Sequence, residues 1–461
     1  YTFAIGDDRP RVVRGTRAKA LIDGPETLAH IEDAIRGARH SVHVEMMLWF
    51  ADETGERIAD LLIEKAEQGV PVRVLVDQRT TETTHTLTAL HGLWLRYLRR
   101  VPTEEKRRVL AHIDAEVELE KRRGAVGPLV KRMRRTANLR LRVSSFPLVF
   151  LRPPPDSDAP AAYQALAEAR PWFNYARVDH RKMVVVDGKT AFLGGMNIGR
   201  EYLHPTPFDP GRTAEEEPFH KWHDVMVALE GPGVRPVQHL FRERWVEEGG
   251  DTFALGPRTD GVGTDPNDPV FPALSAHDDG VPVRVISTTP GARHHVHSTF
   301  LSLMDRAKQR LFISSPYVSS PEALTHVMDA AERGVRVVFI FPDHHNDSVD
   351  FHHAARLHYR ELIEAGVEVY EYQGRMTHAK VLVSDHITVI GSANLNHTSF
   401  FNHYEVAAVV KDKAFTADFV RRLFDVDIGR STRIRARHVD GLIDLNALGR
   451  LYCSAIVDRW Y

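Results

Sequence analysis

The sequence is poor in cysteine, has no long hydrophobic run and carries almost no net charge. Its 461 residues include one cysteine, Cys453, which excludes an internal disulfide framework and a cysteine-rich metal site and fits a reducing compartment. No stretch approaches the roughly 18 consecutive apolar residues that a membrane-spanning helix needs. The formal net charge is -2, so only a local patch could provide an electrostatic surface for nucleic acid.

The start of the chain lacks the basic segment and the apolar core of a signal peptide. The first residue is Tyr1 rather than methionine, which leaves open a signal or anchor ahead of it. We expect a cytoplasmic or peripheral membrane location.

Two stretches of the chain repeat one order of elements. Residues 28–78 predict helix, strand, helix and strand, and residues 297–343 predict the same order. Gly69 and Gly334 end the second helix of each repeat, and the β-branched run that follows is typical of a buried parallel strand. The alternation predicts an α/β fold with right-handed crossovers.

The repeats divide the chain into two halves. We assign residues 1–250 to the first half, 251–281 to a turn-rich linker and 282–461 to the second half. The first half is the longer, and we place a basic insert at about 80–170.

Both halves contain the pattern H-x-K-x4-D followed by G-[GS]-x-N. Histidine and lysine are two residues apart, so on a strand they point to the same face. The glycine-containing end of the next strand then brings the asparagine beside them. The shared residues are His180, Lys182, Asp187, Gly194, Gly195 and Asn197 in the first half, and His378, Lys380, Asp385, Gly391, Ser392 and Asn394 in the second.

These residue types suit the chemistry of a phosphodiester. Lysine ammonium groups and asparagine amides neutralise the anion and stabilise its transition state without a metal. A neutral imidazole can attack phosphorus if a carboxylate holds its other nitrogen, and a second, protonated imidazole can donate to the leaving oxygen. One copy of the pattern supplies half of such a site, and two copies supply all of it.

Candidate carboxylates follow each pattern. Asp224 and Glu405 lie on alternating segments and are predicted to orient the histidines, although either could be an ordinary charge at a strand edge. Asp187 and Asp385 close a strand, where aspartate is commonly a turn former. We interpret these two aspartates, with Gly194, Gly195, Gly391 and Ser392, as structural support of the site.

At these residues the chain resembles the phospholipase D superfamily, and within it the bacterial cardiolipin synthase-like branch. The resemblance covers about residues 28–425 apart from the insert. It implies an α/β fold with two similar α/β/α sandwich halves, related by a pseudo-two-fold axis, and an active site in the cleft between them. It also implies two-step transfer through a covalent phosphohistidine, with no cofactor and no metal.

The resemblance further implies a role for each residue of the site. His180 would be the nucleophile, and His378 the general acid and later the general base. Asp224 and Glu405 would orient these histidines. The residues that would hold the substrate phosphate are Lys182, Lys380, Asn197 and Asn394.

Three features depart from the branch. The chain shows no membrane-spanning segment, the insert is large, and the turn between Asp385 and Gly391 is one residue shorter than its counterpart in the first half. The first two leave cardiolipin synthesis itself open, though not the reaction class.

The insert is locally basic. Residues 92–135 contain thirteen lysines and arginines against six acidic residues, with apolar residues at helical spacing. Such a helix can lie on an anionic membrane surface, and a solvated helical hairpin packed on the first half is the alternative. We expect a phospholipid substrate, peripheral contact with an anionic membrane and no nucleic-acid partner, and we leave the oligomeric state open.

Histidine is abundant, with 26 residues that include clusters at 294–297 and 344–358. No carboxylate or cysteine pattern in the sequence completes a known metal site around them, so we predict no metal. The loop from His344 follows a strand at its carboxyl end, where ligands of α/β proteins bind.

The leading interpretation is therefore a phosphatidyltransferase or phospholipase D that acts on phospholipids, with transfer and hydrolysis undecided. The alternative is a nuclease of the same superfamily, but such nucleases typically carry one motif in each chain. Tyrosyl-DNA phosphodiesterases lack the aspartate found here at 187 and 385. The intact histidine and lysine pairs argue against a third candidate, a non-enzymatic lipid-binding protein.

Overall fold

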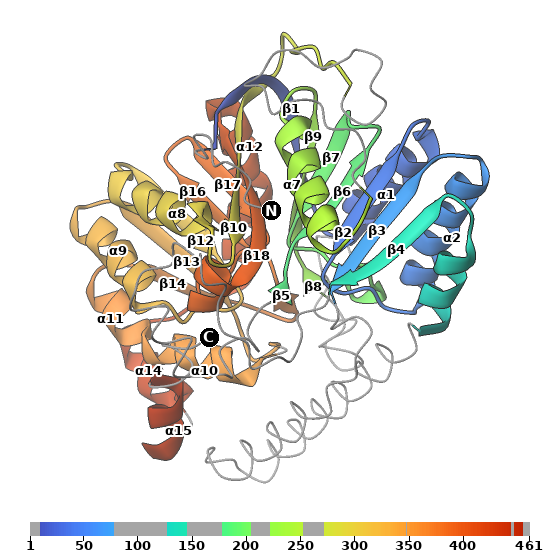
Figure 1. Ribbon diagram of the computed structural model, residues 1–461. Coiled ribbons are helices and arrows are strands. Elements are labelled where there is room, and N and C mark those ends of the chain that lie inside the picture. Colours follow the sequence, from blue (N-terminus) through green and yellow to red (C-terminus); the bar gives the residue numbers. More distant parts are fainter. Residues whose placement is uncertain are drawn as a thin grey trace.

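Two α/β halves lie side by side, and each repeats the order of elements of the other (Figure 1). The structure is a computed structural model. Within the residues that it describes, no helix is long and apolar enough to cross a bilayer. The described residues are 10–77, 127–144, 178–203, 222–251, 272–346, 348–443 and 447–454.

The first half forms a mixed sheet with the strand order β1-β9-β7-β6-β2-β3-β4. Strands β2, β3 and β4 are parallel to one another, and the other neighbours are antiparallel. The strands are β1 (Val13–Ile22), β2 (Val42–Met46), β3 (Val72–Asp77), β4 (Leu139–Ser144), β6 (Lys182–Val186), β7 (Thr190–Gly194) and β9 (Val225–Glu230). The helices are α1 (Gly24–Gly37), α2 (Glu53–Glu67) and α7 (Val234–Glu247).

The second half repeats this sheet as β10-β18-β17-β16-β12-β13-β14 and adds β19 at its edge. The strands are β10 (Val281–Thr289), β12 (Arg310–Ser314), β13 (Arg336–Pro342), β14 (Glu368–Tyr372), β16 (Val381–Ser384), β17 (Ile387–Gly391), β18 (His403–Lys411) and β19 (Ser431–Arg433). The helices are α8 (His295–Arg306), α9 (Pro321–Glu332), α10 (Val349–Leu357), α11 (Tyr359–Glu364), α12 (Lys413–Phe419), α13 (Asp425–Gly429), α14 (Ala436–Leu442) and α15 (Ala447–Tyr452).

Capping residues set the ends of the equivalent helices α2 and α9. The Asp52 carboxylate accepts from two backbone N–H groups at the start of α2, and the Ser320 hydroxyl accepts from one at the start of α9. Gly69 and Gly334 follow these helices with φ of 90° and 84°, a left-handed conformation that costs glycine little. The chain then enters β3 and β13, in the order that the sequence predicted.

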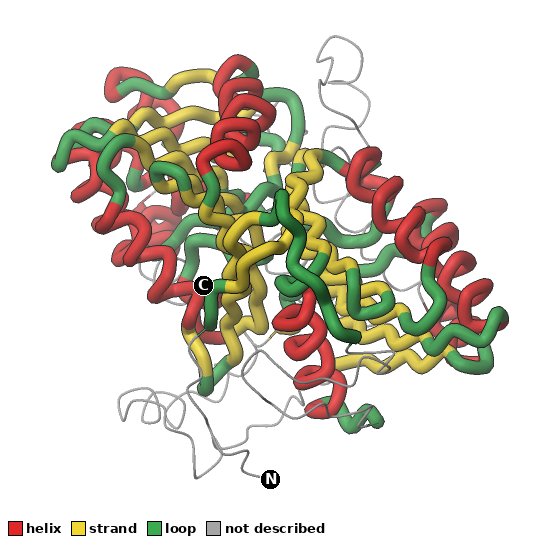
Figure 2. The backbone as a smooth tube through the Cα atoms, turned by 90° about the horizontal axis from the view of Figure 1, so that it is seen from above, coloured by secondary structure: helices red, strands yellow, loops and turns green. Residues whose placement is uncertain are grey.

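Three apolar cores hold the layers together. Helices α1 and α2 pack on one face of the first sheet, and α8 and α9 pack on one face of the second. The third core joins the remaining faces of both sheets with α7 and α12, in the middle of the molecule (Figures 1 and 2). Strands β1 and β10 also pair across the halves. The predicted pair of similar α/β/α halves is confirmed.

Asp187 and Asp385 close equivalent turns at the far ends of β6 and β16 from the histidines. Their φ angles are 54° and 52°, and each carboxylate accepts from three consecutive backbone N–H groups of another loop. The donors are Arg39, His40 and Ser41 for Asp187, and Lys308, Gln309 and Arg310 for Asp385. These aspartates therefore fix the strands that carry the site rather than the site itself.

Part of the interval predicted as an insert belongs to the sheet. Within 80–170, residues 127–135 are helical and β4 follows them, pairing in parallel with β3 as β14 pairs with β13. The rest of that interval lies outside the described residues, and so do residues 92–126 of the predicted basic helix.

The two aspartate turns generate a stability prediction. Asp187→Ala removes an acceptor from three N–H groups and leaves alanine at positive φ, so it should lower the free energy of unfolding by about 1–2 kcal/mol. Asp187→Asn keeps an acceptor oxygen and tolerates that φ, so it should cost less. Urea denaturation measures both, and equal midpoints for Asp187→Ala and the parent chain would contradict this role.

Candidate active site

Each candidate histidine follows a short strand that pairs with the opposite half. His180 follows β5 (Val178–Asp179), which is parallel to the start of β18, and its N–H donates to the Tyr404 carbonyl at 3.0 Å. His378 follows β15 (Met376–Thr377), which is parallel to β8 (Trp222–His223), and its N–H donates to the His223 carbonyl at 2.7 Å. The backbone thus fixes both histidines at the junction of the halves.

Each of the two candidate carboxylates contacts the candidate histidine of the other half. His180 Nδ1 lies 2.9 and 3.0 Å from the two carboxylate oxygens of Glu405. His378 Nδ1 lies 2.7 Å from Asp224 Oδ2. Both carboxylates are fully buried. The structure therefore brings Asp224 and Glu405 to the histidines, as expected, but each contacts the histidine of the other motif.

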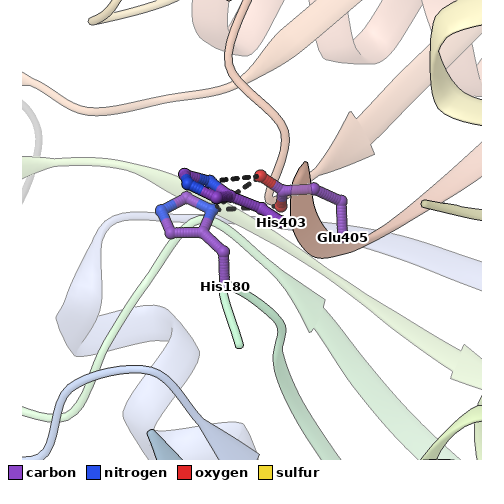
Figure 3. A group of neighbouring side chains, drawn as sticks. All are labelled: His180, His403 and Glu405. Carbon is purple, nitrogen blue, oxygen red and sulfur yellow. Dashed lines mark hydrogen bonds and ion pairs between the residues drawn. The ribbon is translucent and has the colours of Figure 1, made fainter. Parts of the chain in front are cut away.

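The surroundings of the two carboxylates differ. Glu405 accepts a hydrogen bond from the Ser392 hydroxyl and has the His403 ring beside it, 3.7 Å away at Nδ1 (Figure 3). In the first half, Gly195 occupies the position equivalent to Ser392. Trp222 occupies the position equivalent to His403. The Trp222 ring packs against the His378 ring with centroids 4.6 Å apart.

The motif glycines leave room for neighbouring atoms. A Cβ on Gly195 would lie 2.3 Å from Asp224 Oδ1. A Cβ on Gly194 would lie 2.4 Å from the Val225 carbonyl, and one on Gly391 2.4 Å from the Ala407 side chain. Side chains at these positions would displace the strand or the carboxylate that contacts His378.

Burial and charge make the two histidine–carboxylate pairs unequal. Burial lowers the pKa of His180 to about 3, so its imidazole is neutral at pH 7. Burial alone would raise the pKa of Glu405, but the interactions with His180 and His403 outweigh it and hold that pKa below its ordinary value. The Glu405–His180 pair is thus an ionised carboxylate beside a neutral imidazole.

The Asp224–His378 pair is more protonated than the Glu405–His180 pair. Burial raises the pKa of Asp224 to about 7, despite the opposing charge of Lys380. Burial also lowers the pKa of His378 well below its ordinary value, and the charges of Lys380, Lys182 and His180 add to that effect. The last cause shows that the two histidines are within electrostatic reach of one another. Near neutral pH Asp224 is therefore partly protonated, whereas Glu405 is ionised, so the Asp224–His378 pair holds more proton than the other pair.

The two lysines lie beside the histidines. Lys182 Nζ donates to the His180 carbonyl at 2.7 Å, and Lys380 Nζ donates to the His378 carbonyl at 2.6 Å. Burial lowers the pKa of Lys182 to about 7, and Lys380 adds to this against the charge of Glu405. Two buried ammonium groups that repel one another favour an anion between them.

The motif asparagines are anchored differently. Asn197 accepts from the Leu48 N–H at 3.1 Å and donates to the Tyr202 hydroxyl at 3.2 Å. In Asn394 the backbone N–H donates to the Ser399 hydroxyl, while its side-chain oxygen is buried without a hydrogen bond among the described residues. Their binding of the phosphate stays a prediction.

A buried charge network beneath Asp224 was missed by the sequence analysis. His223 contacts Asp23 at 2.7 Å and Asp427 at 3.1 Å, and Arg375 donates to Asp23 at 2.9 Å. Burial lowers the pKa of His223, but the charges of Asp427 and Asp23 outweigh it and raise that pKa well above its ordinary value. The only signal in the sequence was the position of His223 next to Asp224.

The fold also assembles two groups of potential metal-ligating atoms in the described part of the chain. One group is Asp343, His344 and His345, and the other is His180, His403 and Glu405. In the second group the glutamate is 225 residues from His180, so sequence spacing could not reveal it. The predicted absence of a catalytic metal stays a prediction.

Comparisons with known proteins agree with the motifs. A family model described as cardiolipin synthase, PLD-like domain, matches residues 31–206 and 300–426, more than half of the chain. The cardiolipin synthase of Halalkalibacterium halodurans is 29% identical over 429 residues, which cover 92% of this chain and 69% of that protein. That of Alkalihalophilus pseudofirmus is 30% identical over 396 residues, which cover 85% of this chain and 62% of that protein.

The fold is also found in a solved structure. The phosphatidylserine synthase of Haemophilus influenzae Rd KW20 is similar with a TM-score of 0.61, over 96% of this chain and 95% of that one. The identity is 15%, so this likeness concerns the fold.

The close approach of Gly195 to Asp224 gives a prediction. Gly195→Ala should lower the free energy of unfolding by about 1–3 kcal/mol, because the methyl group overpacks a buried carboxylate. Gly37→Ala is the matched control, since a Cβ there meets nothing within 4 Å. Thermal unfolding of both variants measures the difference, and an unchanged midpoint for Gly195→Ala would show that the contact is easily relieved.

Proposed function

Because the chain belongs to the family of cardiolipin synthase-like proteins with a phospholipase D-like domain, we propose that it transfers phosphatidyl groups between alcohols through a phosphohistidine. The observation that carries the proposal is the exchange of carboxylates, which places two oriented imidazoles and two lysines at one junction. The names of the relatives support a phospholipid as the substrate.

In the first step, the Nε2 atom of His180 attacks the phosphorus of the donor phospholipid. Glu405 accepts the Nδ1 proton of His180 in a hydrogen bond, which leaves the Nε2 lone pair free. The bond from phosphorus to the leaving alcohol breaks as the phosphorus–nitrogen bond forms. His378 donates a proton to the departing oxygen, so the alcohol leaves neutral.

In the second step, His378 takes the proton of an acceptor alcohol. The alcohol oxygen attacks phosphorus, and the phosphorus–nitrogen bond breaks to restore neutral His180. With water in place of the alcohol, the same step is hydrolysis and yields the phosphatidic acid.

The unequal protonation of the two pairs supports this division of roles. A nucleophile must be unprotonated at Nε2, and His180 beside ionised Glu405 meets that condition. A general acid must hold a proton near the working pH, and the pair of His378 and Asp224 meets that condition.

Lys182 and Lys380 would bind the phosphate of the phosphatidyl group that is transferred. Without an anion, Lys182 and Lys380 repel one another, and this repulsion contributes to the low pKa of Lys182. A phosphodiester between them relieves the repulsion, and the charge that develops on its oxygens strengthens the attraction. The same two groups can thus serve substrate binding and the transition state.

A nuclease remains the second candidate of the same superfamily. The presence of both motifs in one chain, together with the cardiolipin synthase relatives, favours the lipid substrate.

The decisive experiment offers purified protein three substrates in the presence of EDTA: phosphatidylglycerol vesicles, phosphatidylcholine with a primary alcohol, and single-stranded DNA. We expect new phosphatidyl products by mass spectrometry, and cleavage of DNA alone would sink the proposal. His180→Ala and His378→Ala should each lower turnover by at least about 10³-fold. His386→Ala, a histidine at the far end of β16, is the matched control and should keep its activity.

The pKa values predict the pH dependence of kcat/KM. His180, with a pKa of about 3, stays unprotonated across the neutral range. As the pH rises through about 7, Asp224 and Lys182 lose protons, so the general-acid pair loses its extra proton and the phosphate site loses positive charge. We therefore expect kcat/KM to fall on the alkaline side of about pH 7, and a rate that climbs steadily to pH 9 would contradict the assignment.

A further inference from the structure

Among the differences between the two halves is the position of His403 and Trp222, which the proposed mechanism does not use. His403 and Trp222 each stand two residues before an orienting carboxylate, and each packs against a candidate histidine. The ring centroids are 5.4 Å apart for His403 and His180, and 4.6 Å for Trp222 and His378. Since tryptophan fills this role in the first half, packing alone does not require an imidazole in the second.

His403 brings a third potential metal ligand close to His180 and Glu405. Its Nδ1 lies 3.7 Å from Glu405 Oε1, and that same oxygen lies 2.9 Å from His180 Nδ1 (Figure 3). Each of the three residues offers one ligand atom, and these atoms lie within 4.8 Å of one another. The side chain of His403 is 13% exposed and that of His180 is 7% exposed, so the group borders solvent on the side of the imidazoles.

These separations suit a tetrahedral zinc ion. Zinc binds imidazole nitrogen and carboxylate oxygen at about 2.0–2.2 Å, which places neighbouring ligand atoms roughly 3.3–3.6 Å apart. The distances from Glu405 to the two imidazoles, 2.9 and 3.7 Å, lie on either side of this value, and all three ligand atoms lie within 4.8 Å of one another, so small side-chain movements would bring three protein ligands to one ion. We propose that His180, His403 and Glu405 form a binding site for a divalent transition-metal ion such as Zn²⁺, with water as the fourth ligand.

A metal ion bound at this site would inactivate His180 as a nucleophile, because it would change the tautomer of the imidazole. A neutral imidazole that coordinates metal through Nδ1 carries its proton on Nε2. The proton that His180 Nδ1 shares with Glu405 would therefore move to Nε2, and the lone pair that attacks phosphorus would be lost. The ion would also take the carboxylate of Glu405 as a ligand. The inhibition, though not the binding, rests on the proposed function.

The charges around the site limit its affinity. Lys182 lies within electrostatic reach of both Glu405 and Lys380, and positive charge nearby disfavours a cation. We therefore expect a dissociation constant in the micromolar range. Among the described residues, the equivalent place in the first half offers two donors, from His378 and Asp224, because Trp222 stands where His403 stands in the second half. One ion is expected for each chain at the junction.

The experiment titrates the metal-free full chain with ZnCl₂ by isothermal calorimetry. We expect one bound ion, with affinity lowered at least about tenfold in His403→Phe, which copies the aromatic ring of the other half. His344→Ala removes a ligand from the separate group at 343–345 and is the matched control, with unchanged affinity. His403→Gln provides the same comparison if His403→Phe unfolds, as judged by thermal melting.

The outcomes are distinct. No binding, or binding that His403→Phe and His403→Gln leave intact, overturns the site. Loss of binding in His344→Ala alone places the ion at 343–345 and also overturns it. The lipid assay in EDTA is independent of this result, so failure of the transferase proposal and failure of the metal site can be told apart. Where both hold, added Zn²⁺ should inhibit the parent chain at concentrations at least about ten times lower than those that inhibit His403→Phe.

Discussion

The site depends on one exchange, in which each half of the chain supplies the carboxylate that holds the imidazole of the other. Glu405 reaches back to His180, and Asp224 reaches forward to His378. Two short parallel strand pairs make the same crossing in the backbone. Since all four side chains are buried, their positions follow from how the two sheets pack on the shared middle core. The packing of the two halves and the geometry of the candidate site are therefore determined at the same junction.

Because the sequence repeats one pattern of elements and motifs, the fold of each half and several residues of the site could be predicted from it. The order of helix, strand, helix and strand follows from apolar periodicity and from the glycines that end α2 and α9. The histidine–lysine spacing predicted one shared strand face, but in the structure each histidine stands between two strands, and the lysine begins the second strand or directly precedes it. The acidic segments pointed to Asp224 and Glu405. These inferences need only local sequence, and each half provided a check on the other.

Other features arise only from packing. The crossing of the carboxylates cannot be read from order along the chain, because it depends on how one half is placed against the other. The same holds for Asp23, Arg375 and Asp427, which meet His223 from distant segments. Local composition likewise does not show that β4, which lies within residues 80–170, completes the first sheet.

The crossing also determines at which stage of folding the chain could become reactive. A half that folds ahead of its partner holds a histidine and a lysine but lacks the buried acid that sets the tautomer of that histidine. A complete reactive site would thus form only when both sheets have docked. The topology therefore makes docking of the two halves a condition for activity of either histidine.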